Sequence, residues 1–326
     1  MVAKLLLALL FCVGSIASVQ AGLNIQHWQT AQGARVLFVE NHDLPMLDIS
    51  VDFSAGSARD SREKSGLANL TRYLMSLGAG EYSERDIAEK LADVGALMSG
   101  RFDADRAGFS LRSLSGQAER DQAVSLLAAV LAQPRFDAAV LEREKGRVVA
   151  GLEEAATKPE NIGDKAFQAA IYGDHPYGLS ESGEIDSVKQ LTRDDLVAFH
   201  QRYFRARNMT VAMMGDLSRA EAERIAERLV ANLPAGDAPP PIPPVRINAQ
   251  GQEKIIPHHA TQSHLFTGLP SYQREDPDYF PLYVGNYVLG GGGFDSRLTD
   301  AVRQKKGLAY SVYSYFAPMR QTGPFQ

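Results

Sequence analysis

Apolar and polar residues alternate with a period of two in several short stretches of the chain. The first two are "RVLFVEN" (Arg35–Asn41) and "MLDISVDFSAGS" (Met46–Ser57), which are rich in β-branched residues and are separated by a turn at "HDLP". "LMSGRFDADRAGFSLRSL" predicts two further strands joined near Asp103–Asp105, and "NMTVAMMGDLS" predicts another. Strands of this kind need one buried face, so a layered fold follows.

Between these strands the apolar positions recur at helical spacing. The segments 66–80, 83–96, 116–136, 136–160, 192–204 and 219–233 all read as helices, and a short helix is expected before Tyr172. Ser83 with Asp86, and Thr192 with Asp195, have the spacing of N-terminal caps. Pro134 and Pro159 are expected to end two of the helices. Strands and helices grouped in this order predict an α+β fold.

The composition changes after residue 233. "PAGDAPPPIPPVR" contains six prolines in thirteen residues and predicts an extended linker at 234–246. A second unit at 247–326 is expected to contain a strand "SHLFTGLP", helices "YFPLYVGNYVLGGG" and "DSRLTDAVRQKKG", and a strand "LAYSVYSYF". We therefore predict a first domain at 22–233 and the start of a second domain, which the sequence leaves incomplete.

The first 21 residues predict a secretory signal peptide. One lysine, an apolar run and small residues ending at Ala21 give the expected order, and a membrane anchor is the alternative. Cys12 is the single cysteine and lies inside the apolar run, which argues against a lipidated cysteine. Cleavage would leave a cysteine-free chain with 33 basic and 39 acidic residues, a net charge of −6. This favours a periplasmic protein and argues against nucleic acid as a partner.

The helix predicted at 66–80 carries an unusual polar group. Asn69, Arg72 and Tyr73 have the spacing i, i+3, i+4, which places them on one helical face. They are either solvated or hydrogen-bonded structural residues, or the remains of a functional site.

Five stretches, in order, resemble the insulinase, pitrilysin and mitochondrial-processing-peptidase family of zinc peptidases, the inverzincins. They are "GSARDSREKSGLANLTRYLMSLGA", "FDAAVLEREKGRVVAGLEEAATKPE", "DHPYG", "NMTVAMMGDLS" and "LGGGGFDSRLTDAVRQKKGLAYSVYSYF". The resemblance implies two homologous α/β sandwich domains, each with an antiparallel-rich sheet covered by helices, the second truncated here.

The family's H-x-x-E-H motif supplies two zinc ligands and a general base. The resemblance places Asn69, Arg72 and Tyr73 at these positions. It places Gly151 at the third ligand, although Glu153 and Glu154 follow closely. An amide, a permanent cation and a phenol are poor substitutes for these groups. We therefore expect no catalytic residue and no metal ligand in this chain, and no bound zinc.

The resemblance also implies a substrate-binding pair, Arg303 and Tyr310, in "RQKKGLAY". Both are hydrogen-bond donors suited to a substrate carbonyl or oxyanion. The alternative is a solvated arginine and an ordinary strand tyrosine. His258, His259 and His264 are close in sequence but read as a loop, so we predict no metal site there.

Some members of the family act as two-chain enzymes, in which one subunit carries zinc and the other retains the Arg/Tyr pair. The pattern here implies the second kind of subunit, in the periplasm, with a zinc-bearing peptidase as partner and peptides as substrates. A stand-alone peptide-binding or assembly protein is the alternative. An active peptidase with unusual ligands ranks last, because it would need a metal beside Arg72.

Overall fold

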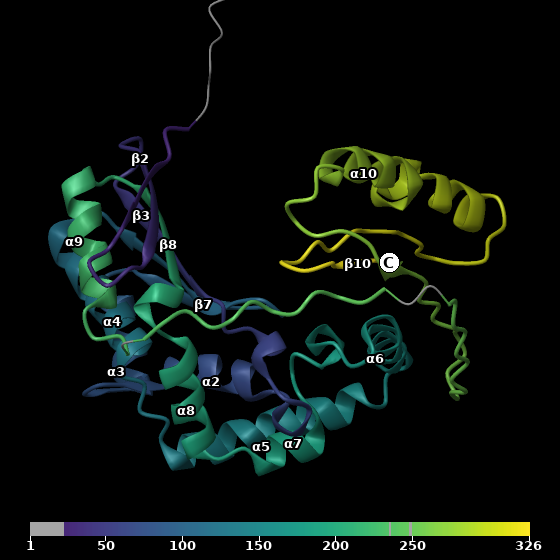
Figure 1. The fold of residues 1–326 in the computed structure, drawn as a ribbon, viewed down its shortest axis with the longest axis horizontal. Coiled ribbons are helices and arrows are strands. Elements are labelled where there is room, and N and C mark those ends of the chain that lie inside the picture. Colours follow the sequence, from purple (N-terminus) through teal and green to yellow (C-terminus); the bar gives the residue numbers. More distant parts are fainter. Residues whose placement is uncertain (1–22, 235, 248–249) are drawn as a thin grey trace, which may run out of the picture.

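A computed structural model describes residues 23–234, 236–247 and 250–326. The predicted signal peptide and Cys12 lie outside the described residues. The described chain forms a large first unit built on one sheet, and a smaller second unit around helix α10 (Tyr279–Asn286) (Figure 1). In the part of the chain described here, no helix is both long enough and apolar enough to cross a membrane.

The first unit contains a six-stranded sheet in the order β1-β2-β8-β3-β7-β6. Its strands are β1 (Gln26–Gln29), β2 (Arg35–Glu40), β3 (Met46–Phe53), β6 (Leu97–Phe102), β7 (Ala107–Leu114) and β8 (Met209–Gly215). All neighbours are antiparallel except β2 and β8. Strand β8 comes late in the sequence and is inserted between β2 and β3, two strands from the beginning of the chain.

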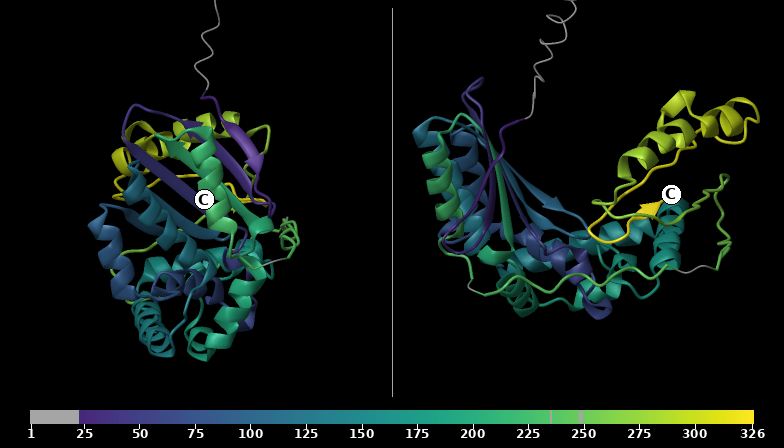
Figure 2. Two further views of the ribbon diagram at one scale, coloured as in Figure 1. Left: turned by 90° about the vertical axis from the view of Figure 1, so that its left-hand side faces the viewer. Right: turned by 45° about the horizontal axis from the view of Figure 1, so that its top comes forward.

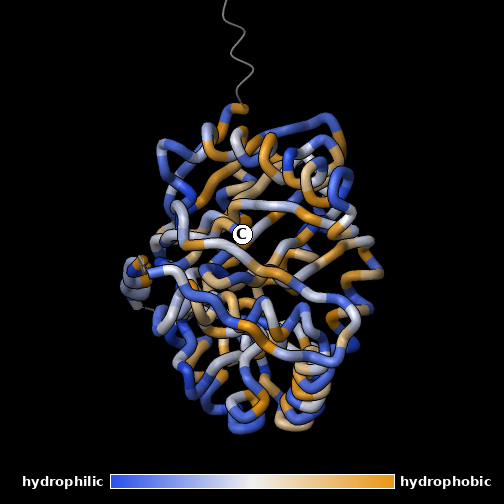
Figure 3. The backbone as a smooth tube through the Cα atoms, turned by 90° about the vertical axis from the view of Figure 1, so that its right-hand side faces the viewer, coloured by the Kyte–Doolittle hydropathy of each residue, from blue (hydrophilic) through white to orange (hydrophobic). Residues whose placement is uncertain are grey.

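One face of this sheet is buried under helices and the other is open. Residues at alternate positions, such as Phe38, Ile49 and Phe109, are at most 2% exposed and form the core. Helices α4 (Gln117–Ala132) and α9 (Arg219–Val230) cover this face, with α3 (Glu84–Asp93) beside α4 (Figures 1 and 2). Hydrophobic and hydrophilic stretches accordingly alternate along the chain (Figure 3). The predicted antiparallel-rich sheet covered by helices is confirmed.

The remaining helices of this unit lie at one end of the sheet. They are α2 (Leu67–Met75), α5 (Ala138–Ala155), α6 (Pro159–Tyr172), α7 (Ile185–Gln190) and α8 (Arg193–Tyr203). The predicted caps form, because Ser83 and Thr192 each accept a bond from the third backbone N–H of the helix and complete a capping box. The helix expected to be short before Tyr172 spans 14 residues.

The helix predicted to run to Gly80 ends earlier, at Met75. Gly78 and Ala79 form a short strand, β4, that pairs with β5 (Tyr82–Ser83). The backbone of Gly78 accepts a hydrogen bond from Arg135, and Gly80 donates one to Gln133. Gly78 also has a φ of +128°, which no helix contains. Long-range backbone bonds therefore replace the last turn of the predicted helix.

The second unit differs most from the prediction. The segment 231–268 has no helix or strand among its described residues, as a proline-rich linker requires, but the strand expected at "SHLFTGLP" is reduced to β9 (Leu269–Pro270). The strand expected at "LAYSVYSYF" does not form, apart from one bridge between Phe316 and Phe325. A strand requires a neighbour for its backbone groups, and here only β10 (Pro324–Phe325) pairs with β9.

The first predicted helix of the second unit forms over nearly its full length, and the second is shorter than expected. Helix α10 continues into a π-helical segment, Tyr287–Gly291, and "DSRLTDAVRQKKG" forms a π-helical segment at Thr299–Gln304. The glycine run ends the first of these, as predicted.

A polar junction joins the second unit to the first. The backbone N–H of Arg320 donates to Asp105, and its guanidinium donates to Ser54. The Tyr177 hydroxyl donates to the other carboxylate oxygen of Asp105 and accepts the backbone N–H of Gln321. Burial and the contact with Asp105 both raise the pKa of Tyr177, so it remains a neutral donor. These bonds hold the end of the chain against the turn between β6 and β7.

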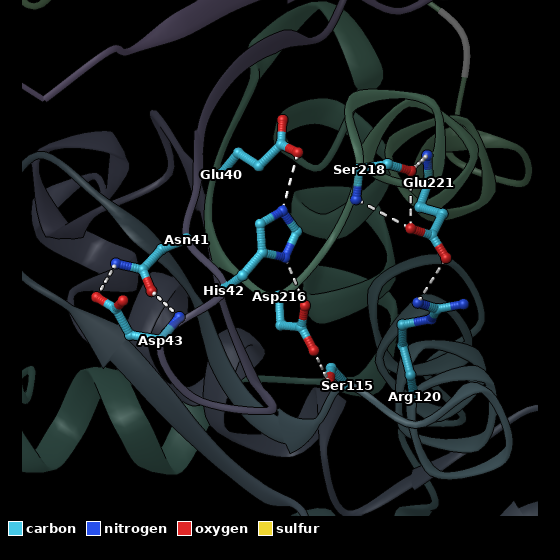
Figure 4. A network of polar contacts seen from close by, with 9 residues as sticks. All are labelled: Glu40, Asn41, His42, Asp43, Ser115, Arg120, Asp216, Ser218 and Glu221. Carbon is cyan, nitrogen blue, oxygen red and sulfur yellow. Dashed lines mark hydrogen bonds and ion pairs between the residues drawn. The ribbon is translucent and has the colours of Figure 1, made fainter.

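A second polar network ties three loops together at the opposite end of the sheet (Figure 4). His42 contacts Asp216 through Nδ1 at 2.6 Å and Glu40 through Nε2 at 3.0 Å. Hydrogen bonds to Asp216 and then Glu40 raise the pKa of His42. Ser115 donates to Asp216 rather than to the histidine, so the arrangement does not activate a serine nucleophile.

The start of α2 depends on the buried carboxyl group of Asp60. Asp60, only 8% exposed, accepts the backbone N–H groups of Gly66 at 2.8 Å and Ala68 at 2.9 Å. These are the groups that a helix N-terminus leaves without intrahelical partners. Burial raises the pKa of Asp60 to about 7, although the backbone hydrogen bonds oppose this rise. The unfolded chain therefore loses this proton at lower pH than the folded chain does.

We predict that Asp60 makes the protein less stable as the pH rises from about 4 to about 7. In this window the unfolded carboxyl is ionised while the folded one still holds its proton, so stability falls by at most about 1.4 kcal/mol per pH unit. Across this range, the free energy of unfolding of the parent protein, measured in urea, should fall relative to that of Asp60→Asn. Asp174→Asn, at a fully exposed side chain, should keep the parent profile. An identical pH dependence for Asp60→Asn and the parent would contradict the prediction.

Candidate functional site

Helix α2 presents one apolar face and one polar face. Its buried residues pack against the sheet and α8, and they are Leu67, Ala68, Leu70, Thr71, Leu74 and Met75. Gly66 precedes the helix with a φ of +93°, and a Cβ there would lie 3.0 Å from the backbone of Gly183. Only glycine fits this approach without strain. The helix is therefore fixed at its start and along its buried side, and the polar residues are left on the other side.

Asn69, Arg72 and Tyr73 lie together on that polar side. Nη2 of Arg72 donates to Oδ1 of Asn69 at 3.1 Å, and Cζ of Arg72 lies 5.7 Å from the centre of the Tyr73 ring. The amide nitrogen of Asn69 donates to the backbone oxygen of Glu181 at 3.2 Å. The predicted spacing thus produces a contiguous group in which each side chain has a hydrogen-bond donor.

Arg72 extends from the helix onto strand β6. A Cβ placed on Gly100 would lie 1.9 Å from Nη1 of Arg72, so the glycine provides the space for the guanidinium. The ring of Phe102 lies 5.9 Å from Cζ on the same strand. Nε of Arg72 is buried without a hydrogen-bond partner. Burial lowers the pKa of Arg72, and only Tyr73 acts against this effect.

These residues do not fit a zinc ion. Catalytic zinc sites use imidazole nitrogens and carboxylate oxygens as ligands. Here a half-buried guanidinium occupies the centre of the group and would repel a divalent cation. Among the described residues, no three His, Cys, Asp or Glu side chains are arranged to hold a metal ion.

The position of the third ligand also has no suitable side chain. Gly151 is exposed on α5, and no atom lies within 4 Å of the place that a Cβ would occupy. Glu153 and Glu154 are exposed as well, and Glu154 pairs with Lys158 at 2.7 Å. Within the described chain, neither carboxylate makes a hydrogen bond or an ion pair with Asn69, Arg72 or Tyr73.

Helix α5 also carries a buried glutamate, Glu144, that the sequence pattern did not single out. Glu144, seven residues before Gly151, is 1% exposed and accepts hydrogen bonds from Arg143 at 2.6 Å and Arg147 at 3.0 Å. The sequence signal was a glutamate between two arginines, a pattern that is usually solvated. Gly100 was missed too, although a glycine inside a strand often marks the close approach of another group.

Arg303 and Tyr310 also come together in the structure. Cζ of Arg303 lies 4.8 Å from the centre of the Tyr310 ring and 4.9 Å from that of Phe294. Tyr310 is 86% exposed. In the described chain the pair makes no hydrogen bond or ring contact with α2, and α10 lies away from that helix (Figure 1). The two candidate groups are therefore separate within this chain.

Three further histidines make local contacts. His264 lies 3.8 Å from Glu160, and Nδ1 of His258 accepts the backbone N–H of Ala260. In the "DHPYG" loop, His175 accepts the backbone N–H of Tyr177 and contacts the backbone oxygen of Pro243. His175 thus joins the linker to the first unit.

Two family models match the chain. The model described as insulinase (peptidase family M16) matches residues 35–183, and the model described as peptidase M16 inactive domain matches residues 190–326. The second match includes β8, whose residues pair with β2 and β3 of the first sheet.

The chain is also similar to individual proteins of this family, both in structure and in sequence. A crystal structure of a peptidase M16 inactive domain from Pseudomonas fluorescens is 37% identical, with a TM-score of 0.86, and the match covers 93% of this chain and 73% of that one. An uncharacterized zinc protease of Mycobacterium leprae is 28% identical, over 86% of this chain and 63% of its own length. A non-peptidase homolog, YmxG, of Helicobacter pylori is 26% identical, over 85% and 64%.

The chain thus spans about three fifths of the length of the curated relatives it matches. Together, the matched models, the sheet architecture and the residues of α2 show that the chain belongs to the insulinase (M16) peptidase family, as a member with a degenerate zinc motif.

Proposed function

We propose that this protein is a non-catalytic, peptide-binding subunit of a periplasmic two-chain zinc peptidase. The observation that carries the proposal is the Asn69–Arg72–Tyr73 group, in which donors linked to one another stand where the family has ligands and a base. The zinc would belong to a partner subunit of the same family.

The second unit supports a role beside a partner's active site. Arg303 and Tyr310 are stacked, and Tyr310 is exposed, so both donors are available to a group outside this chain. A guanidinium and a phenol stabilise the negative charge that develops on a peptide carbonyl during hydrolysis. The pair would act in the partner's reaction and not at α2.

The first unit offers a surface for an extended peptide. Strand β6 is at the edge of the sheet and pairs only with β7 among the described strands. Leu97 on this strand is 67% exposed, and Ser99 and Gly100 are exposed as well. An open strand edge can take up a peptide through backbone hydrogen bonds. This supports peptide binding by a chain that has no hydrolytic group of its own at α2.

We predict that zinc binding appears only when the family's ligands are restored. The variant N69H/R72E/Y73H/G151E should bind one zinc ion, because it supplies two imidazoles, a base and a third ligand. N69H/Y73H/G151E, which retains the Arg72 cation, should bind zinc far more weakly. Isothermal titration with zinc and metal analysis of the purified proteins measure this. One tightly bound zinc ion in the unaltered protein would contradict the conclusion that Asn69, Arg72 and Tyr73 do not fit zinc.

We predict that Arg303→Ala reduces the peptidase activity of the assembled complex, isolated with its natural partner, by about 100-fold or more in kcat, since loss of one oxyanion donor has effects of this size. Tyr310→Phe should also reduce it. Arg297→Ala, at an exposed arginine of the same unit, is the matched control and should retain activity. If the complex with Arg303→Ala retains full activity, Arg303 and Tyr310 do not act in the partner's reaction. Peptide binding without any co-purifying peptidase would instead favour a stand-alone binding protein.

A further inference from the structure

The charge preference of the α2 site is the reverse of that of a zinc site. A zinc motif presents lone pairs to a cation, whereas Arg72 and Tyr73 present a guanidinium and a phenol, both of which can donate. Asn69 turns its amide oxygen to Arg72 and uses its amide nitrogen on the backbone oxygen of Glu181. A group of converging donors around a fixed positive charge attracts an anion. The same helical face has therefore become suited to a ligand of opposite charge.

Arg72 lacks the partner that a half-buried arginine usually has. The described residues place no carboxylate within 4 Å of its guanidinium, and its one hydrogen bond goes to the neutral amide of Asn69. By contrast, Arg112 binds both oxygens of Asp48, and Arg106 binds Asp103. A cation that burial has partly stripped of water gains more than an exposed one from a new anionic partner.

The site is open on the side where a peptide would arrive. Tyr73 is 36% exposed, and Gly100, over which Nη1 of Arg72 lies, is exposed on the edge strand β6. Nη1 makes no hydrogen bond within the described chain. An extended chain along β6 would therefore pass the free end of the guanidinium.

We propose that Asn69, Arg72 and Tyr73 form a carboxylate-binding site that selects peptides carrying a free C-terminus or an acidic side chain beside strand β6. This rests on the proposed peptide-binding function and specifies which peptides it favours. The carboxylate accepts hydrogen bonds from Nη1 of Arg72 and the Tyr73 hydroxyl, while Asn69 holds the guanidinium in place.

The test uses the full protein and labelled ten-residue neutral peptides. One pair differs only in a free or amidated C-terminus, and a second, amidated pair carries one internal Glu or Gln. We expect the acid of at least one pair to bind about ten- to a hundredfold more tightly, as for a hydrogen bond to a charged group. The pair that shows the difference identifies the source of the carboxylate.

Substitutions at Arg72 test whether its guanidinium causes the preference for the acid peptides. Arg72→Gln should abolish it, Arg72→Lys should retain part of it, and Arg72→Glu should reverse it. Arg85→Gln, at an exposed arginine of α3, should leave it unchanged. Equal binding of acid and amide peptides, or a preference that survives in Arg72→Gln, would overturn the carboxylate site and leave the proposed function intact.

A second measurement separates the two proposals. N-acetylglycine should shift the Nε–H resonance of Arg72 in the labelled protein, and N-acetylglycinamide should not. If this shift occurs while no peptide binds, the carboxylate site stands and the peptide-binding function fails. If neither ligand shifts the resonance, the carboxylate site is wrong.

Discussion

The two hydrogen bonds from the start of α2 to the buried carboxyl group of Asp60 fix the position of everything that follows on that helix. They satisfy backbone N–H groups that no side chain at the N-cap could reach, because the N-cap is Gly66. Rotation of α2 would break these bonds and expose its six buried residues. Asn69, Arg72 and Tyr73 are therefore held toward the edge of the sheet.

The same constraint explains how a peptidase scaffold persists without its metal. The apolar face of α2 packs against the sheet and α8, and none of these contacts depends on zinc. The polar face is stabilised by bonds among its own residues and by the space at Gly100. Replacement of the ligands thus changes the chemistry of the surface while the fold is kept. The result is a site whose charge preference favours an anion.

The two candidate groups lie in different units and do not meet within this chain. Arg303 and Tyr310 are stacked on each other near Phe294, whereas Arg72 lies on β6. A function that needs both therefore involves either two separate binding events or a second chain. This arrangement is consistent with a subunit that binds peptide at one place and assists a reaction at another.

Elements with strong local signals could be predicted from neighbouring residues. The caps at Ser83 and Thr192, the alternating strands and the family resemblance all depend on neighbouring residues, so they could be predicted. Four features could not be predicted in this way: the early end of α2, the loss of the strand at "LAYSVYSYF", the insertion of β8 and the role of Gly100. Each of these depends on residues far apart in the chain. Helix α2 ends early because Gly78 pairs with Arg135, and the expected strand is lost because it has no neighbouring strand. Strand β8 pairs with β2 across about 170 residues, and the guanidinium of Arg72 needs the space that Gly100 leaves.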